Sequence, residues 1–127
     1  MDYLLDTHTF LWFINGSVEL SPQAKNIIQN PANTLYLSIA DFWEIAIKMN
    51  IGKLSIDMSF EELLNEANKN DFQILPIQLE DIRVLTTLEL YHKDPFDRIL
   101  IAQAMQNNLT VITKDSNFEF YPVKIIW

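Results

Sequence analysis

Segments typical of strands alternate with segments typical of helices along most of the chain, and this alternation constrains the fold more than any other feature. Short apolar runs bounded by polar residues predict buried strands. These runs are Tyr3–Asp6, Thr34–Ser38, Phe72–Ile77, Leu109–Thr113 and Val123–Trp127. Strands that alternate with helices form right-handed crossovers, so we expect a mostly parallel sheet covered on both faces, in a three-layer α/β/α fold.

The segments between these strands carry the start signals and apolar periodicity of helices. Ser21 followed by Pro22 marks one helix start, and Ser59 with Glu62 three residues later forms a capping box. The predicted helices are Ser21–Asn30, Ile39–Asn50 after a Ser38 cap, Ser59–Asn70, Leu79–Leu90 and Asp94–Asn108. The chain has 127 residues without a linker or repeat, so we expect a single domain over residues 1–127.

Composition argues against several classes of function. The chain has no cysteine, which excludes disulfides, thiolate metal sites and cysteine nucleophiles. Its two glycines lie outside any glycine-rich loop, which argues against nucleotide-cofactor and ATPase sites. No apolar run is long enough to span a membrane and the N-terminus is acidic, so we expect a cytoplasmic protein without membrane contact. The net charge of −8 argues against a general basic surface for nucleic acid, but carboxylates neutralised by metal remain compatible with such a substrate.

Four acidic residues follow predicted strands or lie in the first turns of predicted helices, where sites form in parallel sheets. They are Asp6, Glu44, Asp97 and Asp115. Each also has a purely structural interpretation. Asp6 and Asp115 suit the capping of a helix or turn. Glu44 suits a solvent-exposed pair with Lys48, on a helix face that both share with Asp41.

The segment HKDPFDRILIAQA, His92–Ala104, contains two aspartates near a predicted helix start, and helix capping explains one of them better than the other. Asp94 before Pro95 is explained by helix capping, and its spacing from Arg98 also suits an ion pair. Asp97 is explained less well, because a capping box prefers the longer Glu or Gln at this position, although the helix dipole favours a carboxylate there. Asp97 is therefore the acid that local helix physics leaves unexplained.

Several carboxylates at one edge of a sheet raise each other's pKa and destabilise the fold unless a cation compensates them. With oxygen ligands and no cysteine, the expected cation is Mg²⁺ or Mn²⁺. Such a site polarises phosphoryl oxygens and activates water for attack on a phosphate. The four acids are thus candidates for both catalysis and metal binding.

Four motifs carry a resemblance to a known family: LLDTHTFLW, LSIADFWEIAIKMNIGKL, HKDPFDRILIAQA and VITKDSNFEFY. In order and spacing they resemble the PIN-domain nucleases, and among these the small VapC-type ribonuclease toxins of bacterial toxin–antitoxin pairs. The resemblance spans Leu4–Tyr121. It implies a PIN fold, cleavage of RNA with Mg²⁺ or Mn²⁺, and an antitoxin that inserts a helix and a side chain near the active site. By position, it implies that Asp6, Glu44, Asp97 and Asp115 form the acidic quartet, and that Asp115 acts through water or holds a second ion.

Other polar residues lie beside the quartet in the sequence. Thr7, Ser38, Thr113 and Asp94 could orient a carboxylate or water, or serve only as caps and strand-end partners. Basic residues near the quartet could hold RNA phosphates or balance the acids; they are Lys48, Lys53, Lys93, Arg98 and Lys114. A histidine beside such acids is more often a packed or hydrogen-bonding neighbour than a general base, so we favour the former role for His8 and His92; the sequence leaves both roles open.

An aromatic-rich group of residues is expected to lie mostly in the core, and any exposed part would suit a homodimer contact or an antitoxin groove. It comprises Phe10, Trp12, Phe13, Ile14, Phe42 and Trp43. One alternative function is an inactive PIN-like protein-binding module, which would have no need of four mutually repelling acids. Another is a phosphatase of the haloacid dehalogenase type, which needs an aspartate two residues after Asp6, where this chain has His8.

Overall fold

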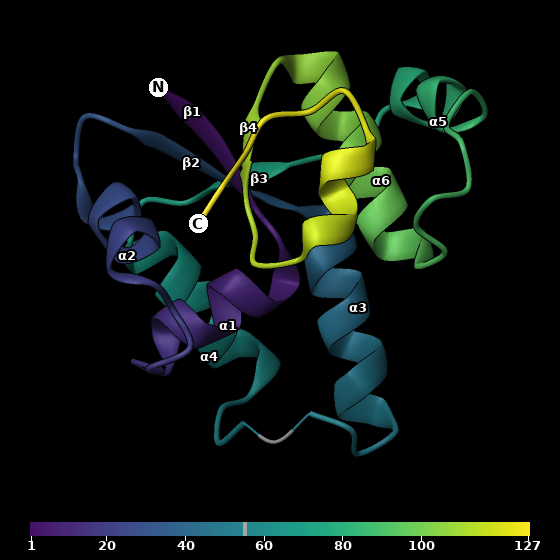
Figure 1. Cartoon of the computed structure of the whole chain (residues 1–127). Helices are drawn as coiled ribbons and strands as arrows, with labels where there is room; N and C mark the ends of the chain where they lie inside the picture. The colour runs from purple at the N-terminus through teal and green to yellow at the C-terminus, as the bar shows by residue number, and fades with distance from the viewer. Residues whose placement is uncertain (55) are drawn as a thin grey trace.

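Five parallel strands form the central sheet of the computed structural model, which describes residues 1–54 and 56–127 (Figure 1). The strands are β1 Asp2–Leu5, β2 Thr34–Ser38, β3 Gln73–Leu75, β4 Thr110–Ile112 and β5 Ile125–Ile126. Their order across the sheet is β3-β2-β1-β4-β5, and each neighbouring pair is parallel. The prediction of a mostly parallel sheet is confirmed, and β2 has its predicted bounds while the other strands differ at their ends.

Six α-helices occur within the described residues, and a short 3-10 helix follows β4. They are α1 Thr7–Ile14, α2 Pro22–Gln29, α3 Ile39–Asn50, α4 Phe60–Lys69, α5 Leu79–Leu85, α6 Pro95–Asn107 and the 3-10 helix η1 Ser116–Phe120. Ser21, Ser38, Ser59 and Asp94 cap the helices that the sequence predicts them to cap. In this part of the chain, no helix combines the length and the apolar character that a membrane crossing requires.

Helix α5 is shorter than predicted, because the segment expected to be helical through Leu90 leaves the helix after Leu85. The hydroxyls of Thr86 and Thr87 donate to the carbonyl oxygens three residues earlier, at 2.7 Å each. Such local bonds compete with helical hydrogen bonding and favour a turn. The residues that follow form a turn-containing connection to α6 instead of a last helical turn.

Alternate residues of the strands face two separate hydrophobic cores, as the twofold repeat of a strand requires. In β1, Leu5 belongs to the core that contains Phe10 of α1, whereas Leu4 belongs to the core that contains Leu100 of α6. Figure 1 shows α1, α2 and α4 on one side of the sheet and α5 and α6 on the other. Helices therefore cover both faces, and the predicted three-layer α/β/α arrangement is confirmed.

The strand order reverses between β1 and β4, and such a switch point is where parallel sheets form their sites. The carboxyl ends of these two strands are joined by a hydrogen bond from Asp6 N–H to the carbonyl oxygen of Ile112 at 3.4 Å. The Thr9 hydroxyl of α1 donates to the same carbonyl oxygen at 2.9 Å. The residues that follow β1 and β4 are consequently held side by side at one edge of the sheet.

Ser38 connects three elements through one buried hydroxyl. Its Oγ donates to Gln103 Oε1 of α6 at 2.6 Å and accepts from Ala40 N–H of α3 at 2.9 Å. Both Ser38 and Gln103 are completely buried. The hydroxyl thus ties the end of β2 and the start of α3 to the middle of α6.

Replacing Ser38 with Ala should lower the free energy of unfolding by about 2–3 kcal/mol, because α3 loses its cap and a buried amide oxygen loses its donor. Ser21→Ala is the matched control, since the Ser21 hydroxyl accepts from Ala24 N–H as a cap in a less buried position. That variant should lose only about 1 kcal/mol. Denaturant unfolding of both variants measures the difference, and equal losses would contradict the role given to the Ser38–Gln103 bond.

Candidate active site

Carboxylates from four separate elements meet at the edge of the sheet between β1 and β4. They are Asp6, the cap of α1; Glu44 of α3; Asp97 in the first turn of α6; and Asp115, the cap of η1. The first two are buried and the last two half-buried. The charges of the other three all act on Asp97, which shows that they lie near it. The structure therefore brings together all four acids that the sequence singles out, and we refer to them as the acidic site.

Asp6 has both of its carboxylate oxygens engaged. Oδ1 accepts from Thr9 N–H at 2.9 Å, which is the capping role that its position predicts. Oδ2 accepts from the Thr113 hydroxyl at 2.6 Å, across the ends of β1 and β4. Burial raises the pKa of Asp6 above its usual value, and these hydrogen bonds oppose that rise. Capping and membership of the acidic site are thus combined in one residue.

Asp41 is buried, although the sequence predicts it on a solvent-exposed face with Glu44 and Lys48. Asp41 is 1% exposed and Glu44 6% exposed, because this face of α3 packs against the start of α1. Thr7 Oγ1 lies 2.8 Å from Asp41 Oδ1 and 2.9 Å from Glu44 Oε1. The predicted ion pair between Lys48 and Glu44 is present, with 2.7 Å between Nζ and Oε2. It is not fully exposed to solvent as predicted, because the Glu44 side chain is buried and that of Lys48 is partly buried.

A threonine hydroxyl carries one proton, so Thr7 can donate to only one of these two carboxyl groups. Burial raises the pKa of Asp41 well above its usual value; bonds from Thr7 and Ser38 oppose this, and the charges of Asp6 and Glu44 add to it. The raised pKa favours the protonated form of Asp41, and in that form Asp41 can donate to Thr7 while Thr7 donates to Glu44. Asp41 lies next to the acidic site, and its raised pKa lowers the negative charge that it adds there.

Asp97 lies near several other acidic side chains. The capping carboxylate of Asp94 accepts from the amides of Phe96 at 2.8 Å and of Asp97 at 3.1 Å, which fixes the first turn of α6. Burial raises the pKa of Asp97 to about 8, and the charges of Asp94 and of the other three acids add to this effect. A carboxyl that remains protonated at neutral pH shows how strongly the site is crowded with negative charge.

His92 links Asp97 and Asp115. Its Nε2 lies 3.0 Å from Asp97 Oδ2 and 2.9 Å from Asp115 Oδ2. Its Nδ1 accepts from Asp94 N–H at 3.2 Å, which places the ring proton on Nε2 and makes Nε2 the donor toward both carboxyl groups. This is the hydrogen-bonding role that the sequence favours. The ligand atoms of these three side chains lie within 4.8 Å of one another, close enough to hold a metal ion.

Arg98 does not form the predicted ion pair with Asp94, whose carboxylate is engaged by amides of its own helix. The guanidinium instead donates to oxygens of the connection between α5 and α6 and of the C-terminal segment. These acceptors are the carbonyls of Leu88 at 3.3 Å, Glu89 at 2.9 Å and His92 at 3.3 Å, and the Tyr121 hydroxyl at 3.3 Å. Arg98 therefore holds the segment that carries His92.

The remaining predicted residues differ in what they contact. The hydroxyl of Thr7 hydrogen-bonds to Glu44, and that of Thr113 hydrogen-bonds to Asp6. The Ser38 hydroxyl instead donates to Gln103 of α6 and stabilises the fold. Among the lysines, Lys48 pairs with Glu44, Lys114 pairs with Glu19 at 3.0 Å, and Lys53 and Lys93 are exposed. Their contact with RNA phosphates stays a prediction.

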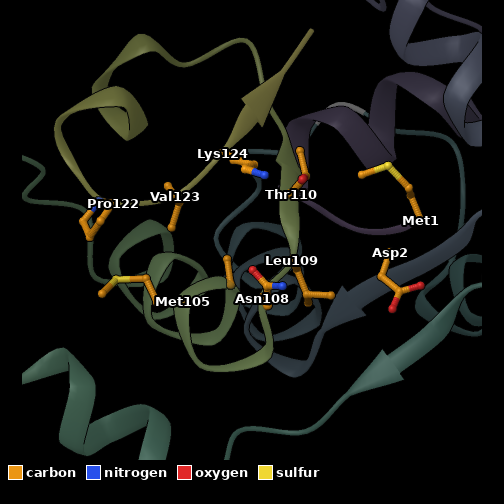
Figure 2. A pocket seen from close by; sticks show the side chains of 10 residues that line it. Met1, Asp2, Met105, Asn108, Leu109, Thr110, Pro122, Val123 and Lys124 are labelled. Carbon is orange, nitrogen blue, oxygen red and sulfur yellow. The ribbon is translucent and has the colours of Figure 1, made fainter.

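Two cavities lie at opposite edges of the sheet. A cavity of about 640 Å³ lies at the amino ends of β1 and β4. Asp2, Asn108 and Lys124 are among the residues that line it (Figure 2). None of the four acids is among its described lining residues. A smaller cavity of about 300 Å³ touches the acidic site through Asp6 and Asp115. The larger cavity is therefore remote from the acids, and the smaller one is part of their surroundings.

An acid-lined site at the switch point of a parallel sheet is typical of α/β domains that can hold a divalent cation. The PIN domain family matches residues 3–124, so the chain belongs to the PIN domain family and has its nuclease fold. No curated protein sequence matches the chain.

Several solved structures share this fold. A chain of VapBC2 from Rickettsia felis, solved with a DNA fragment from its promoter, has a TM-score of 0.74 at 16% identity, covering 99% of this chain and 98% of that one. A chain of VapBC-5 from Mycobacterium tuberculosis, a VapBC-family toxin–antitoxin system, has a TM-score of 0.64 at 18% identity, with 98% and 97% covered. The PIN domain endonuclease Utp24 has a TM-score of 0.56 at 15% identity, with 99% and 85% covered.

Without a divalent cation, the raised pKa of Asp97 should make the protein less stable as pH rises. The folded state keeps this proton up to about pH 8, whereas an unfolded carboxyl loses it near the usual value of 3.8. The stabilisation is therefore complete below the unfolded pKa and is lost as pH rises through the folded pKa.

Asp97→Asn, which is neutral at every pH, should flatten this dependence, leaving a slope from Asp6 and Asp41. Urea unfolding in a chelator, from about pH 5 to about pH 8.5, measures the slope in both proteins. The same slope in both would contradict the assignment to Asp97.

Proposed function

We propose that the chain is a divalent-metal-dependent ribonuclease that acts in the cytoplasm as the toxin of a toxin–antitoxin pair. The observation that carries this proposal is the convergence of four acids, with the pKa of Asp97 raised to about 8. A module used only for protein binding has no need to gather mutually repelling carboxylates. The likeness to a VapBC toxin–antitoxin protein and to a PIN endonuclease supports the same proposal.

The donors of the acidic site fit Mg²⁺ or Mn²⁺. They are carboxylate oxygens, the ligands that hard cations prefer, and the chain has no cysteine that would favour a softer metal. The ion would be held by the carboxylates of Asp6, Glu44, Asp97 and Asp115. Asp97 would lose its proton when the ion binds and would then carry its full negative charge. When bound, such an ion polarises phosphoryl oxygens and lowers the pKa of water.

The protein's own groups hold these carboxylates in place. Thr113 and the Thr9 amide fix the two oxygens of Asp6, and Thr7 fixes Glu44. His92 holds Asp97 and Asp115 toward each other. Partners of this kind orient metal ligands before the ion binds and strengthen its binding. The half-buried Asp97 and Asp115 form the side of the site that a phosphodiester would approach.

RNA is the proposed substrate, and a cognate antitoxin and a second copy of the chain are the proposed protein partners. Lys48, Lys93 and Lys114 would contact RNA phosphates, whereas the guanidinium of Arg98 already donates to protein oxygens and would act through the segment that it holds. Trp43 of the aromatic-rich group is 60% exposed and lies on α3 beside the exposed Ile39 and Ile47. Exposed aromatic and aliphatic side chains of this kind are typical of the centre of protein interfaces, so we assign this surface to a protein contact.

Adding Mg²⁺ or Mn²⁺ to the chelator-treated protein should raise its melting temperature, because an ion that binds only the folded state stabilises it. At an ion concentration about 100 times the dissociation constant, the gain is about 2.7 kcal/mol. Thermal melting of the wild type, Asp97→Asn and Glu61→Gln measures the effect. Glu61, an exposed acid at the start of α4, is the control and should keep the full shift. No shift in the wild type would favour the non-enzymatic module.

Asp6→Asn and Asp97→Asn should each slow the cleavage of single-stranded RNA in Mg²⁺ by about 100-fold or more, since each removes a ligand charge. Glu61→Gln should cleave at the wild-type rate. A fluorophore-labelled RNA reports the cleavage, and circular dichroism confirms that each variant is folded. Undiminished cleavage by a folded Asp97→Asn protein would refute the proposed role of the acidic site.

A further inference from the structure

The cavity of about 300 Å³ beside the acidic site has aromatic and cationic walls as well as acidic ones. It is lined by Asp6, His8, Trp12, Lys114 and Asp115, and we call it the Trp12 pocket. We propose that the Trp12 pocket binds one unpaired nucleotide of the RNA, with the base stacked on Trp12 and a phosphate held by Lys114. This inference rests on the proposed ribonuclease function and adds a substrate-binding site to it.

The aromatic wall comes from His8 and Trp12 of α1, where Trp12 packs against the margin of the core that contains Phe10 and stays partly exposed. His8 and Trp12 are one helical turn apart and share one face of the helix, with ring centroids 5.6 Å apart and planes inclined by 35°. Phe10, on the opposite face, is fully buried, whereas His8 is exposed and Trp12 half-buried. Trp12 also packs against Trp127 at 5.8 Å, which holds the indole in place. A ring that is fixed and still partly exposed can stack a base at a low entropic cost.

The cationic wall is Lys114, which follows β4 directly. Its Nζ lies 5.8 Å from the centre of the Trp12 ring and 3.0 Å from Glu19 Oε2. The Lys114 and Glu19 side chains are 54% and 53% exposed, so water and salt screen this ion pair. A phosphate can therefore replace Glu19 as the partner of Lys114 without leaving a buried charge behind.

The charges around the pocket restrict what can bind there. Asp6 and Asp115 repel a phosphate, so nucleotide binding should require the divalent cation of the proposed acidic site. Stacking on an aromatic ring depends little on base identity, so the pocket should accept more than one base. The base must also be unpaired, because the faces of bases in an RNA duplex are covered by their neighbours. A volume of about 300 Å³ lies at the small end of ligand sites and suits one nucleotide, not a duplex.

Nucleoside 5′-monophosphates test this proposal, because they have no phosphodiester bond that the enzyme could cleave. The ¹⁵N-labelled protein in Mg²⁺ is titrated with AMP, with UMP and with ribose 5-phosphate, which lacks a base. The chain has three tryptophans, whose indole N–H signals are resolved by NMR and assigned by substitution. We expect both nucleotides, but not ribose 5-phosphate, to shift the Trp12 signal saturably, and a chelator to weaken this binding.

Trp12→Leu should weaken nucleotide binding by about 5- to 100-fold, measured at the Lys114 amide, whereas Trp12→Phe should keep most of it. Phe120→Leu is the control, because Phe120 is an exposed aromatic residue that packs against Tyr91 and is not among the residues that line the Trp12 pocket. It should bind nucleotides as the wild type does. The rise in melting temperature with Mg²⁺ should persist in Trp12→Leu, which shows that this variant is folded and its acidic site is intact.

Equal responses to AMP and ribose 5-phosphate, or no saturable shift at Trp12, would overturn the nucleotide pocket. If RNA cleavage nevertheless depends on Asp97 and Mg²⁺, the proposed ribonuclease function stands without it. A Trp12 signal that responds to an arginine-rich peptide but not to nucleotides would assign the pocket to a protein partner and also overturn the proposal. If the wild-type protein shows no metal-dependent cleavage of RNA, that result counts against the ribonuclease function itself.

Discussion

Repulsion among the carboxylates that the parallel sheet gathers at one edge is the constraint on which the rest of the site depends. The carboxyl ends of β1 and β4 are adjacent, so the acids that follow them cannot move apart without breaking the sheet. The protein limits this repulsion with protons and neutral donors. Raised pKa values favour the neutral forms of Asp41 and Asp97, and hydroxyls and the ring of His92 donate to the acids beside them. A divalent cation would neutralise the negative charge that remains.

Capping and site chemistry are not alternatives in this chain, because both use the same property of a helix start. The first amides of a helix lack partners within it and carry partial positive charge, so they hold and stabilise a carboxylate. Asp6, Asp94 and Asp115 each accept such an amide and also lie at the acidic site or next to it. The fold can therefore present acids at one edge of the sheet while each of them contributes to local stability.

The position of His92 depends on a segment that has little regular structure of its own. Arg98 binds three carbonyl oxygens and the Tyr121 hydroxyl, and so ties the connection between α5 and α6 to the C-terminal part of the chain. The backbone amide of His92 donates to the same hydroxyl at 2.8 Å. A side chain on α6 thus controls the geometry of a histidine that precedes the helix, and through it the spacing of Asp97 and Asp115.

The sequence by itself determined the order of the elements, most helix starts and the placing of the acids at element ends, because caps, prolines and apolar periodicity act over a few residues. It also singled out Asp97, since helix capping explains Asp94 but explains Asp97 less well. Only the tertiary structure decided that Asp41 is buried, although the SIAD cap at Ser38 was a local sign that this side chain turns back toward the helix start. The burial of Asp41 depends on α1 packing against α3, and the partners of Arg98 and His92 depend on the C-terminal segment meeting the connection between α5 and α6. Local patterns cannot encode such contacts, because their free energy arises only when both sides are present.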